Sequence, residues 1–373
     1  MKHPPPALRR LEKRLQALAD DGLLRTRPEP VAEVGRSFCS NDYLGLASRV
    51  SPGAPSGAGA SRLIAGERKE HRQLETALAS WLGVPDVLLF SSGYAANVGT
   101  IAALAQPGDL VVSDELNHAS LIDGCRLGRG RVEVVPHLEL DAVERALSGK
   151  RGGQAWVVTE SYFSMDADAP DLAALRRLCD RQDAALVVDE AHALGVFGPA
   201  GRGLCAEVGV VPDVLIGTLG KAFGSSGAFV AGSEPLVAWL WNRARSFVFS
   251  TGIAPVTALA SLTALPTVAE DAALRARLHS NAHRLRQGLA GLGLAPRGFG
   301  PIIPLVIGDA RRAVTAATEL RGAGLHVQAV RPPTVPTGTA RLRVTATALH
   351  SEADIDQALA CFERTLPWLA PSS

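Results

Sequence analysis

The sequence has 373 residues, and its 38 basic and 37 acidic side chains leave a formal net charge of +1. This length suits one large domain with a smaller one, because domains usually hold about 100–200 residues. Apolar residues make up 47% and charged residues 20%, so the chain can bury a sizeable core and is not globally disordered. The balanced charge argues against a protein that binds nucleic acid through a basic face.

The cysteines indicate the compartment. There are five, scattered without a C-x-x-C pair: Cys39, Cys125, Cys179, Cys205 and Cys361. In a chain of this length the pattern indicates reduced thiols in a cytoplasmic protein rather than disulfides or a zinc site. The nine histidines show neither H-E-x-x-H nor closely paired spacings, so we expect no metal.

Two segments bear on a membrane or secretion. Met1–Arg14 is basic and lacks the apolar core of a secretion signal. The longest uncharged run, Ser246–Ala269, contains two prolines and seven Ser or Thr residues, which a membrane-spanning helix would rarely carry. We therefore predict buried protein interior for this run and no membrane segment.

The first two thirds of the chain predict an α/β domain. Apolar spacing predicts a helix over Leu8–Asp20, and the Gly-, Ala-, Ser- and Pro-rich Ser51–Gly66 is predicted as a loop. Short apolar runs then alternate with helical segments, which indicates a mainly parallel sheet covered on both faces. The predicted strands are Val87–Phe90, Leu110–Ser113, Val132–Val135, Ala155–Thr159, Ala185–Asp189, Val214–Gly217 and Ala228–Ala231, and the helices between them include Glu70–Leu82, Asp141–Leu147 and Leu172–Gln182.

After about Leu265 the pattern changes to a compact α+β unit. We predict a helix over Ala272–Leu292, a strand over Ile302–Ile307, a helix over Arg311–Arg321, strands over Val327–Val330 and Arg341–Thr345, and a helix over Glu352–Leu366. The predicted organisation is an N-terminal helix and arm over 1–45, a large α/β domain over 46–265 and a small C-terminal α+β domain over 266–373.

Lys221 is a candidate reactive amine. It lies in Gly217–Gly224, among small and apolar residues that follow a predicted strand. Desolvation there would lower the lysine pKa, and a neutral amine is what imine formation with an aldehyde cofactor requires. A surface-loop lysine fits this segment equally well.

Asp189 and His192 follow another predicted strand, in the region where open sheets bind ligands. Buried carboxylates are uncommon without a partner, and a protonated pyridine nitrogen is a suitable one. Asp is also a common helix N-cap, so Asp189 alone fits either role. His192, three residues further on, could reach the same cofactor.

Val187–His192 also matches the second nucleotide-binding motif of DEAH-box helicases. That class needs G-x-x-x-x-G-K-[ST] as well. Around Lys221, Leu215 replaces the first Gly and Ala222 replaces the Ser or Thr, and the order of the two motifs is reversed. The sequence therefore argues against a helicase.

Two further segments leave functional and structural interpretations open. Ser91–Asn97 follows a strand and opens a helix, where backbone N–H groups could hold a phosphate, but an ordinary strand–turn–helix junction explains it as well. His118, in Asp114–Ser120, could stack on a planar cofactor and donate a proton, or it could be a structural histidine.

Six motifs in order resemble those of the α-oxoamine synthases, pyridoxal-phosphate enzymes of fold type I. They are Ser40–Leu46, Ser92–Asn97, Asn117–Ser120, Ser164–Asp166, Asp189–His192 and Thr218–Lys221. The resemblance covers about residues 8–366. It implies a large domain with a mainly parallel seven-stranded sheet, a small C-terminal α+β domain, and pyridoxal 5′-phosphate as cofactor.

The segment Val330–Arg343 resembles the biotin-pathway members of the family, which join L-alanine to a pimeloyl thioester of CoA or a carrier protein. Its Arg-Pro-Pro-Thr start and Gly-Thr-Ala-Arg-Leu-Arg end are typical of them. Members that use glycine or another acyl donor usually differ there, and they are the main alternative. Gly57–Arg62 departs from the family pattern, because two consecutive glycines are more common at its middle.

The resemblance assigns cofactor contacts. Lys221 holds the cofactor covalently and moves the α-proton, Asp189 pairs with the pyridine nitrogen, and His192 touches the 3-oxygen of the ring. His118 stacks on the ring and orients or protonates the condensing carbonyl. The other implied contacts are Gly93, Tyr94, Ser164 and Thr218, with Ser250 and Thr251 reaching the phosphate of a neighbouring subunit.

The resemblance also implies substrate contacts, at Asn41, His118, Arg25, Thr334 and Arg343. Arg343 grips the amino-acid carboxylate bidentately, as guanidinium geometry favours, while Arg25 and Thr334 contact the acyl substrate. Without the resemblance, Arg25 would be interpreted as a solvated surface charge and Arg343 as a strand-edge charge.

Family members form homodimers with shared active sites, so we expect a homodimer. The third possibility is a non-catalytic homologue that acts as a scaffold subunit, although Lys221 and its partners are all present.

Overall fold

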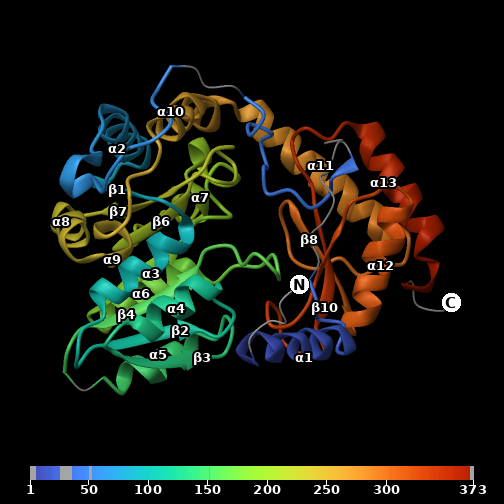
Figure 1. The fold of residues 1–373 in the computed structure, drawn as a ribbon, viewed down its shortest axis with the longest axis horizontal. Helices are drawn as coiled ribbons and strands as arrows, with labels where there is room; N and C mark the ends of the chain where they lie inside the picture. The colour runs from blue at the N-terminus through green and yellow to red at the C-terminus, as the bar shows by residue number, and fades with distance from the viewer. Residues whose placement is uncertain (1–5, 26–35, 50–52, 151, 370–373) are drawn as a thin grey trace. The chain divides into compact units, whose positions relative to one another are not determined.

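The computed structural model describes residues 6–25, 36–49, 53–150 and 152–369 (Figure 1). The chain forms two compact units. Unit 1 comprises Met1–Ser40, Met165–Ala167 and His279–Ser373, and unit 2 comprises Asn41–Ser164 and Asp168–Leu278. The ranges 1–45, 46–265 and 266–373 stay a prediction of where the domain boundaries fall. Met1–Arg14 was predicted not to be a secretion signal, and its first five residues lie outside the described residues.

The described part of unit 2 contains a seven-stranded sheet in the order β1-β7-β6-β5-β4-β2-β3. Strands β2 to β6 run parallel to one another, whereas β7 is antiparallel to both β1 and β6. Their bounds are β1 Asp86–Phe90, β2 Leu110–Asp114, β3 Arg131–Val135, β4 Ala155–Glu160, β5 Ala184–Asp189, β6 Val214–Thr218 and β7 Ala228–Gly232. The predicted mainly parallel sheet is confirmed.

Alternate residues of each strand point to opposite sides of this sheet, and apolar residues lie on both sides. Helices therefore cover both faces. Val111 of β2 packs with Leu240 and Phe247 on one face, whereas the neighbouring Val112 lies with Val143 on the other. The helices of unit 2 are α2 Lys69–Leu82, α3 Gly93–Leu104, α4 Ala119–Leu127, α5 Leu140–Ser148, α6 Leu172–Arg181, α7 Gly203–Glu207, α8 Glu234–Arg243, α9 Arg245–Val248 and α10 Pro255–Glu270, with short turns η2 Arg62–Gly66 and η3 Pro199–Gly201.

Unit 1 is the predicted α+β unit, with α1 added. Its described strands, β8 Ile302–Gly308, β9 Gln328–Val330 and β10 Ala340–Thr345, form an antiparallel sheet in the order β8-β10-β9. The helices are α1 Pro6–Asp20, α11 Ala272–Gly291, α12 Ala310–Gly322 and α13 Glu352–Thr365, followed by the turn η4 Pro367–Leu369; α11 belongs to unit 1 from His279 onward. Leu285, Leu320, Leu342 and Phe362 from α11, α12, β10 and α13 share one buried core. Figure 1 shows α11, α12, β10 and α13 in orange to red and α1 in blue.

The predicted loop Ser51–Gly66 is wrong at its end, where Arg62–Gly66 forms a π-helical turn. Arg62 is buried there because its guanidinium binds the carboxylates of Glu67 and Glu75 at 2.6 Å each. The two carboxylates compensate the buried positive charge of Arg62. Composition alone does not reveal that this arginine is buried. Ser51 and Pro52 lie outside the described residues.

The predicted burial of Ser246–Ala269 is confirmed only in part. Ala258, Ala264 and Val268 of α10 are buried, but Phe249, just after α9, is 73% exposed. The Phe249 ring lies against the Arg245 guanidinium, whose Cζ is 5.0 Å from the ring centroid. Phe249 lines the same pocket as Leu127, which is 65% exposed, and exposed apolar side chains that gather in this way mark a candidate contact surface for another molecule.

Within the described ranges, no helix combines the length and the apolar composition needed to cross a bilayer. The same residues contain no group of three or more His, Cys, Asp or Glu side chains that could hold a metal ion.

Candidate active site

Asp189 is the last residue of β5, and its side chain is buried at 7% exposure. Asn97 Nδ2 donates to its Oδ2 at 2.7 Å, and the Ala191 backbone N–H donates to its Oδ1 at 2.8 Å. A turn rather than a helix follows β5, so the N-cap interpretation of Asp189 is wrong. The carboxylate is held in one orientation at the carboxyl end of the sheet, where open α/β sheets bind ligands.

A chain of hydrogen bonds joins Asp189 to His118. Asn97 Nδ2 also contacts Ser120 Oγ at 2.8 Å, and Ser120 Oγ lies 2.7 Å from His118 Nδ1. The Ser120 backbone N–H donates to the same Nδ1 at 3.2 Å. Since Nδ1 is the acceptor, a neutral His118 carries its proton on Nε2.

The surroundings favour that neutral form. Although His118 is partly accessible to solvent, neighbouring protein atoms desolvate its ring, and this burial lowers its pKa. The Lys221 charge lowers it further, while the Asp189 carboxylate acts in the opposite direction. The net pKa shift of His118 is downward, which suits a ring that stacks on a flat ligand and donates one proton.

Lys221 lies half-buried in the turn between β6 and β7. Leu219 N donates to Gly227 O at 2.9 Å, and Gly224 N donates to Lys221 O at 2.9 Å, so the backbone of the turn is held. Gly224 has a φ of +62°, and a Cβ there would lie 2.3 Å from the Leu46 carbonyl carbon. Only glycine fits, because both the backbone angle and the space exclude a side chain.

Glu160, at the end of β4, lies at the same edge of the sheet. Its Oε1 accepts the His118 backbone N–H at 2.7 Å. Burial and the Asp189 carboxylate raise the pKa of Glu160, and the Lys221 charge opposes them. Lys221 follows β6, the strand that pairs with β5, and its charge and that of Asp189 both act on the pKa values of His118 and Glu160.

His192 is buried, and its Nδ1 lies 2.7 Å from the Tyr43 hydroxyl. The same hydroxyl contacts Asn41 Oδ1 at 3.4 Å. Tyr43 therefore ties His192 to Asn41, two predicted site residues that lie 151 positions apart in the sequence.

Four other predicted cofactor contacts belong to the same unit. Gly93 opens α3, and a Cβ on it would lie 3.8 Å from Thr218 Oγ1, so the two residues are neighbours. Ser164 is buried, whereas Tyr94 is 47% exposed and its hydroxyl donates to Asp123. Their contacts with a cofactor stay predictions.

Ser250 and Thr251 lie in the segment between α9 and α10, with Ser250 half-buried and Thr251 exposed. A buried histidine, His71, holds the end of this segment through a 2.8 Å contact between its Nε2 and Ile253 O. Thr251 is thus accessible on a segment whose backbone is fixed.

Arg25, Thr334 and Arg343 belong to unit 1, and the other predicted site residues belong to unit 2. Arg25 Nη2 donates to Thr334 Oγ1 at 3.5 Å, so this predicted pair is brought together. The strand-edge interpretation of Arg343 is wrong, because β10 is the central strand and the side chain is only 6% exposed. Its Nη1 donates to Thr345 Oγ1 at 3.1 Å.

Four residues of this site were not predicted as site residues from the sequence: Asn97, Ser120, Tyr43 and Glu160. Asn97, Ser120 and Tyr43 stood inside the recognised motifs, and Glu160 directly follows an apolar run, so their positions carried a signal. Asn97, Tyr43 and Glu160 form hydrogen bonds with Asp189, His192 and His118 in other elements, and no spacing rule connects these pairs.

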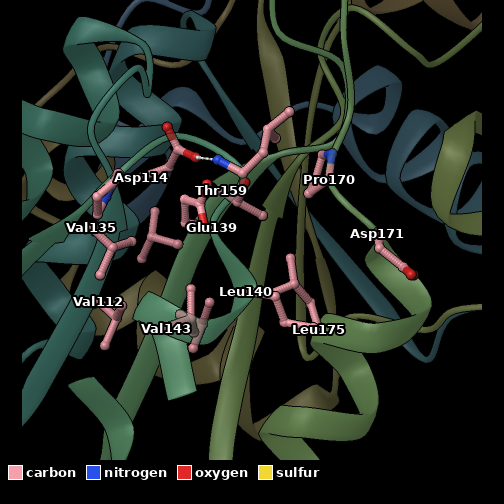
Figure 2. Close-up of a pocket in the computed structure, with 14 residues that line it drawn as sticks. Val112, Asp114, Val135, Glu139, Leu140, Val143, Thr159, Pro170, Asp171 and Leu175 are labelled. Atoms are coloured by element: carbon pink, nitrogen blue, oxygen red, sulfur yellow. Dashed lines mark hydrogen bonds between the residues drawn. The ribbon is translucent and has the colours of Figure 1, made fainter. Parts of the chain in front are cut away.

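A cavity lined by Val112, Val143, Thr159 and Leu175 lies between the sheet and α5 and α6 (Figure 2). None of the predicted site residues lines it. It offers about 50 Å³ to water-sized molecules, which suits a few waters and no coenzyme. This cavity is separate from the candidate active site.

Comparison with known proteins identifies the class. The aminotransferase class I and II family matches residues 36–362. A curated 8-amino-7-oxononanoate synthase of Anaeromyxobacter dehalogenans strain 2CP-1 is 45% identical over 380 aligned residues, covering 96% of each chain. The enzyme of that name from Marinobacter nauticus is 45% identical, covering 94% of this chain and 93% of its own. A solved structure of SPT with PLP superposes with a TM-score of 0.89 at 26% identity, covering 99% of each chain.

The chain belongs to the aminotransferase class I and II family and, within it, to the 8-amino-7-oxononanoate synthase family that the curated relatives define. It is a fold type I, pyridoxal-phosphate-dependent transferase, so the predicted fold class, enzyme class and cofactor are confirmed. The helicase and scaffold interpretations are not retained.

Proposed function

We propose that the protein catalyses the decarboxylative condensation of L-alanine with a pimeloyl thioester, a step of biotin biosynthesis. The products are 8-amino-7-oxononanoate, carbon dioxide and the free thiol of CoA or of a carrier protein. The observation that carries the proposal is the buried Asp189, joined through Asn97 and Ser120 to His118, with Lys221 in the turn after the neighbouring strand β6. The names of the curated relatives support these substrates over glycine and other acyl donors.

The side chains fit pyridoxal phosphate. Asp189 offers a buried carboxylate to a protonated ring nitrogen, His118 offers the flat face of a neutral ring, and Lys221 offers an amine to an aldehyde. When bound, this cofactor supplies an electron-accepting ring that stabilises negative charge on the carbon next to an attached amine.

Each of the central residues has a defined role. Lys221 would hold the bound cofactor and moves the proton of the α-carbon of alanine. Asp189 would keep the ring nitrogen of the cofactor protonated through its charge, and His192 would contact its 3-oxygen. His118, protonated on Nε2, donates to the thioester carbonyl as negative charge develops there. A carbon–carbon bond forms as the carbon–sulfur bond breaks, the alanine carboxyl group then leaves as carbon dioxide, and the α-carbon takes up a proton to give the aminoketone.

The remaining contacts orient the two substrates and the cofactor. Arg343 binds the alanine carboxylate, since a guanidinium pairs with both oxygens of a carboxylate. Arg25 and Thr334, joined by a hydrogen bond, bind the acyl substrate, and Asn41 completes the substrate set. The other proposed cofactor contacts are Gly93, Tyr94, Ser164 and Thr218.

The proposed compartment is the cytoplasm. All five cysteines lie in the described part of the chain and all five are free thiols, which suits a reducing environment.

We expect the holoenzyme to be a homodimer in which Ser250 and Thr251 reach the cofactor phosphate of the partner. The exposed Phe249, next to this pair, supports a second chain covering this surface. Sedimentation at assay concentration should therefore give the mass of two chains. A fully active monomer would contradict the shared site.

Thiol release tests the proposed substrates directly. The holoenzyme is mixed with alanine, glycine or serine and with pimeloyl or acetyl thioesters, and free thiol is measured. We expect alanine with the pimeloyl thioester to give the highest kcat/KM. The advantage over glycine should be about tenfold to two-hundredfold, since one methyl in an apolar pocket is worth about 1–3 kcal/mol. A higher kcat/KM for glycine would assign the protein to the glycine-using members instead.

A further inference from the structure

In unit 2, His137 lies outside the candidate active site and connects two carboxylates from different parts of the chain. His137 Nδ1 lies 2.9 Å from Asp114 Oδ1, and its Nε2 lies 3.3 Å from both oxygens of Asp168. Asp114 ends β2, His137 follows β3, and Asp168 follows β4. An imidazole that donates from both nitrogens carries a positive charge.

The two carboxylates stabilise that charge. Burial alone lowers the pKa of His137, but the hydrogen bonds and charges of Asp114 and Asp168 outweigh it and raise the pKa to about 10. Glu115 also faces this histidine, since its Oε1 accepts the His137 backbone N–H at 3.0 Å. Two carboxylates therefore contact the imidazole, and a third holds the backbone of the same residue.

Asp114 connects His137 to the turn that carries His118. Its Oδ1 accepts the Leu116 backbone N–H at 2.8 Å, two residues before His118. Its Oδ2 accepts the Leu138 N–H at 3.0 Å, the hydrogen bond drawn at Asp114 in Figure 2. Asp114 thus fixes the turns after β2 and β3 together.

Asp168 and Phe163 connect His137 to the loop that carries Ser164. Phe163 N donates to Asp168 O at 2.9 Å, which closes the base of the loop. The Phe163 ring meets the imidazole edge to face, with centroids 4.5 Å apart and planes at 87°. His137 therefore contacts Phe163 and Asp168, the residues on either side of the segment that begins with Ser164.

The geometry points to His137 as a positioning residue, which as an imidazolium clamps the turn of His118 to the loop of Ser164 and so prepares unit 2 for its cofactor. The inference depends on the proposed roles of His118 and Ser164. It concerns only cofactor binding, so it can fail while the proposed substrates stand.

The test compares His137→Gln with His283→Gln. Glutamine keeps one donor but neither the charge nor the bridge, whereas His283 is an exposed histidine on α11 and serves as the matched control. The dissociation constant of pyridoxal phosphate is measured on the apoprotein by equilibrium dialysis, without substrates. We expect it to rise about tenfold to a hundredfold in His137→Gln, because small displacements of positioned groups have effects of this size. Equal constants in His137→Gln and His283→Gln would overturn the inference.

A second variant keeps the inference testable if His137→Gln does not fold. Asp168 is one-third exposed, so Asp168→Asn removes one charge of the clamp with little loss of packing. It should weaken cofactor binding in the same direction, and the double variant should lose no more than the larger single loss. Additive losses would show two independent effects and contradict the clamp.

The charge itself is measured on the unaltered apoprotein. Nuclear magnetic resonance of labelled histidines should show a His137 pKa well above its ordinary value of 6.5. A raised pKa stabilises the fold fully below pH 6.5, and this contribution is lost as the pH rises towards 10. A measured pKa at or below 6.5 would overturn the inference.

Discussion

Lys221→Ala should abolish turnover while the fold remains intact. The variant loses both the amine that holds the cofactor and the group that moves the α-proton, so we expect kcat to fall about a thousandfold or more. The turn should persist, because its backbone hydrogen bonds do not involve the lysine side chain. Steady-state thiol release and circular dichroism measure the two properties.

Lys13→Ala is the control for this variant, since Lys13 is an exposed lysine on α1. It should keep both the rate and the fold. If Lys221→Ala retained a rate within tenfold of the unaltered enzyme, the assignment of Lys221 would be wrong.

Asp189→Asn should remove most of the activity with much less loss of stability. The amide has the size of the carboxylate but no charge, so it cannot keep a pyridine nitrogen protonated, and we expect a loss in kcat of about a hundredfold or more. Its NH2 group would also face Asn97 Nδ2, now 2.7 Å from Oδ2, unless the amide turns its oxygen to that side.

The loss of the Asp189 charge has a second signature, in the pKa values of its neighbours. The carboxylate raises the pKa of both His118 and Glu160, so its removal should lower both. Titration of the apoprotein by nuclear magnetic resonance checks this shift. Unchanged activity together with unchanged pKa values would remove Asp189 from the proposed site.

Most strands were predictable because they are short, apolar and buried, and β3 is the mostly exposed exception. All five residues of β2, β6 and β7 are buried, so their sequences lack the alternation of a half-exposed strand. The same apolar runs locate Asp189 and the turn of Lys221, because polar residues directly after a strand lie at the ligand-binding edge of the sheet.

What the sequence could not reveal depends on contacts between distant segments. Nothing around Arg343 shows that its strand is central, because β9 and β8 pair with it from other parts of the chain. The exposure of Phe249 likewise depends on where α9 ends. The His137 bridge joins residues 23 and 31 positions away, and no spacing rule connects them.

The fate of the alanine carboxyl carbon tests the central claim most directly. The holoenzyme is incubated with a pimeloyl thioester and with L-alanine that carries carbon-13 only in its carboxyl group, and the products are identified by mass spectrometry. Decarboxylative condensation predicts that all of the label appears in carbon dioxide, that the aminoketone is unlabelled, and that one thiol is released per molecule formed. Label retained in pyruvate, as in a transamination, or in the condensation product would contradict the account.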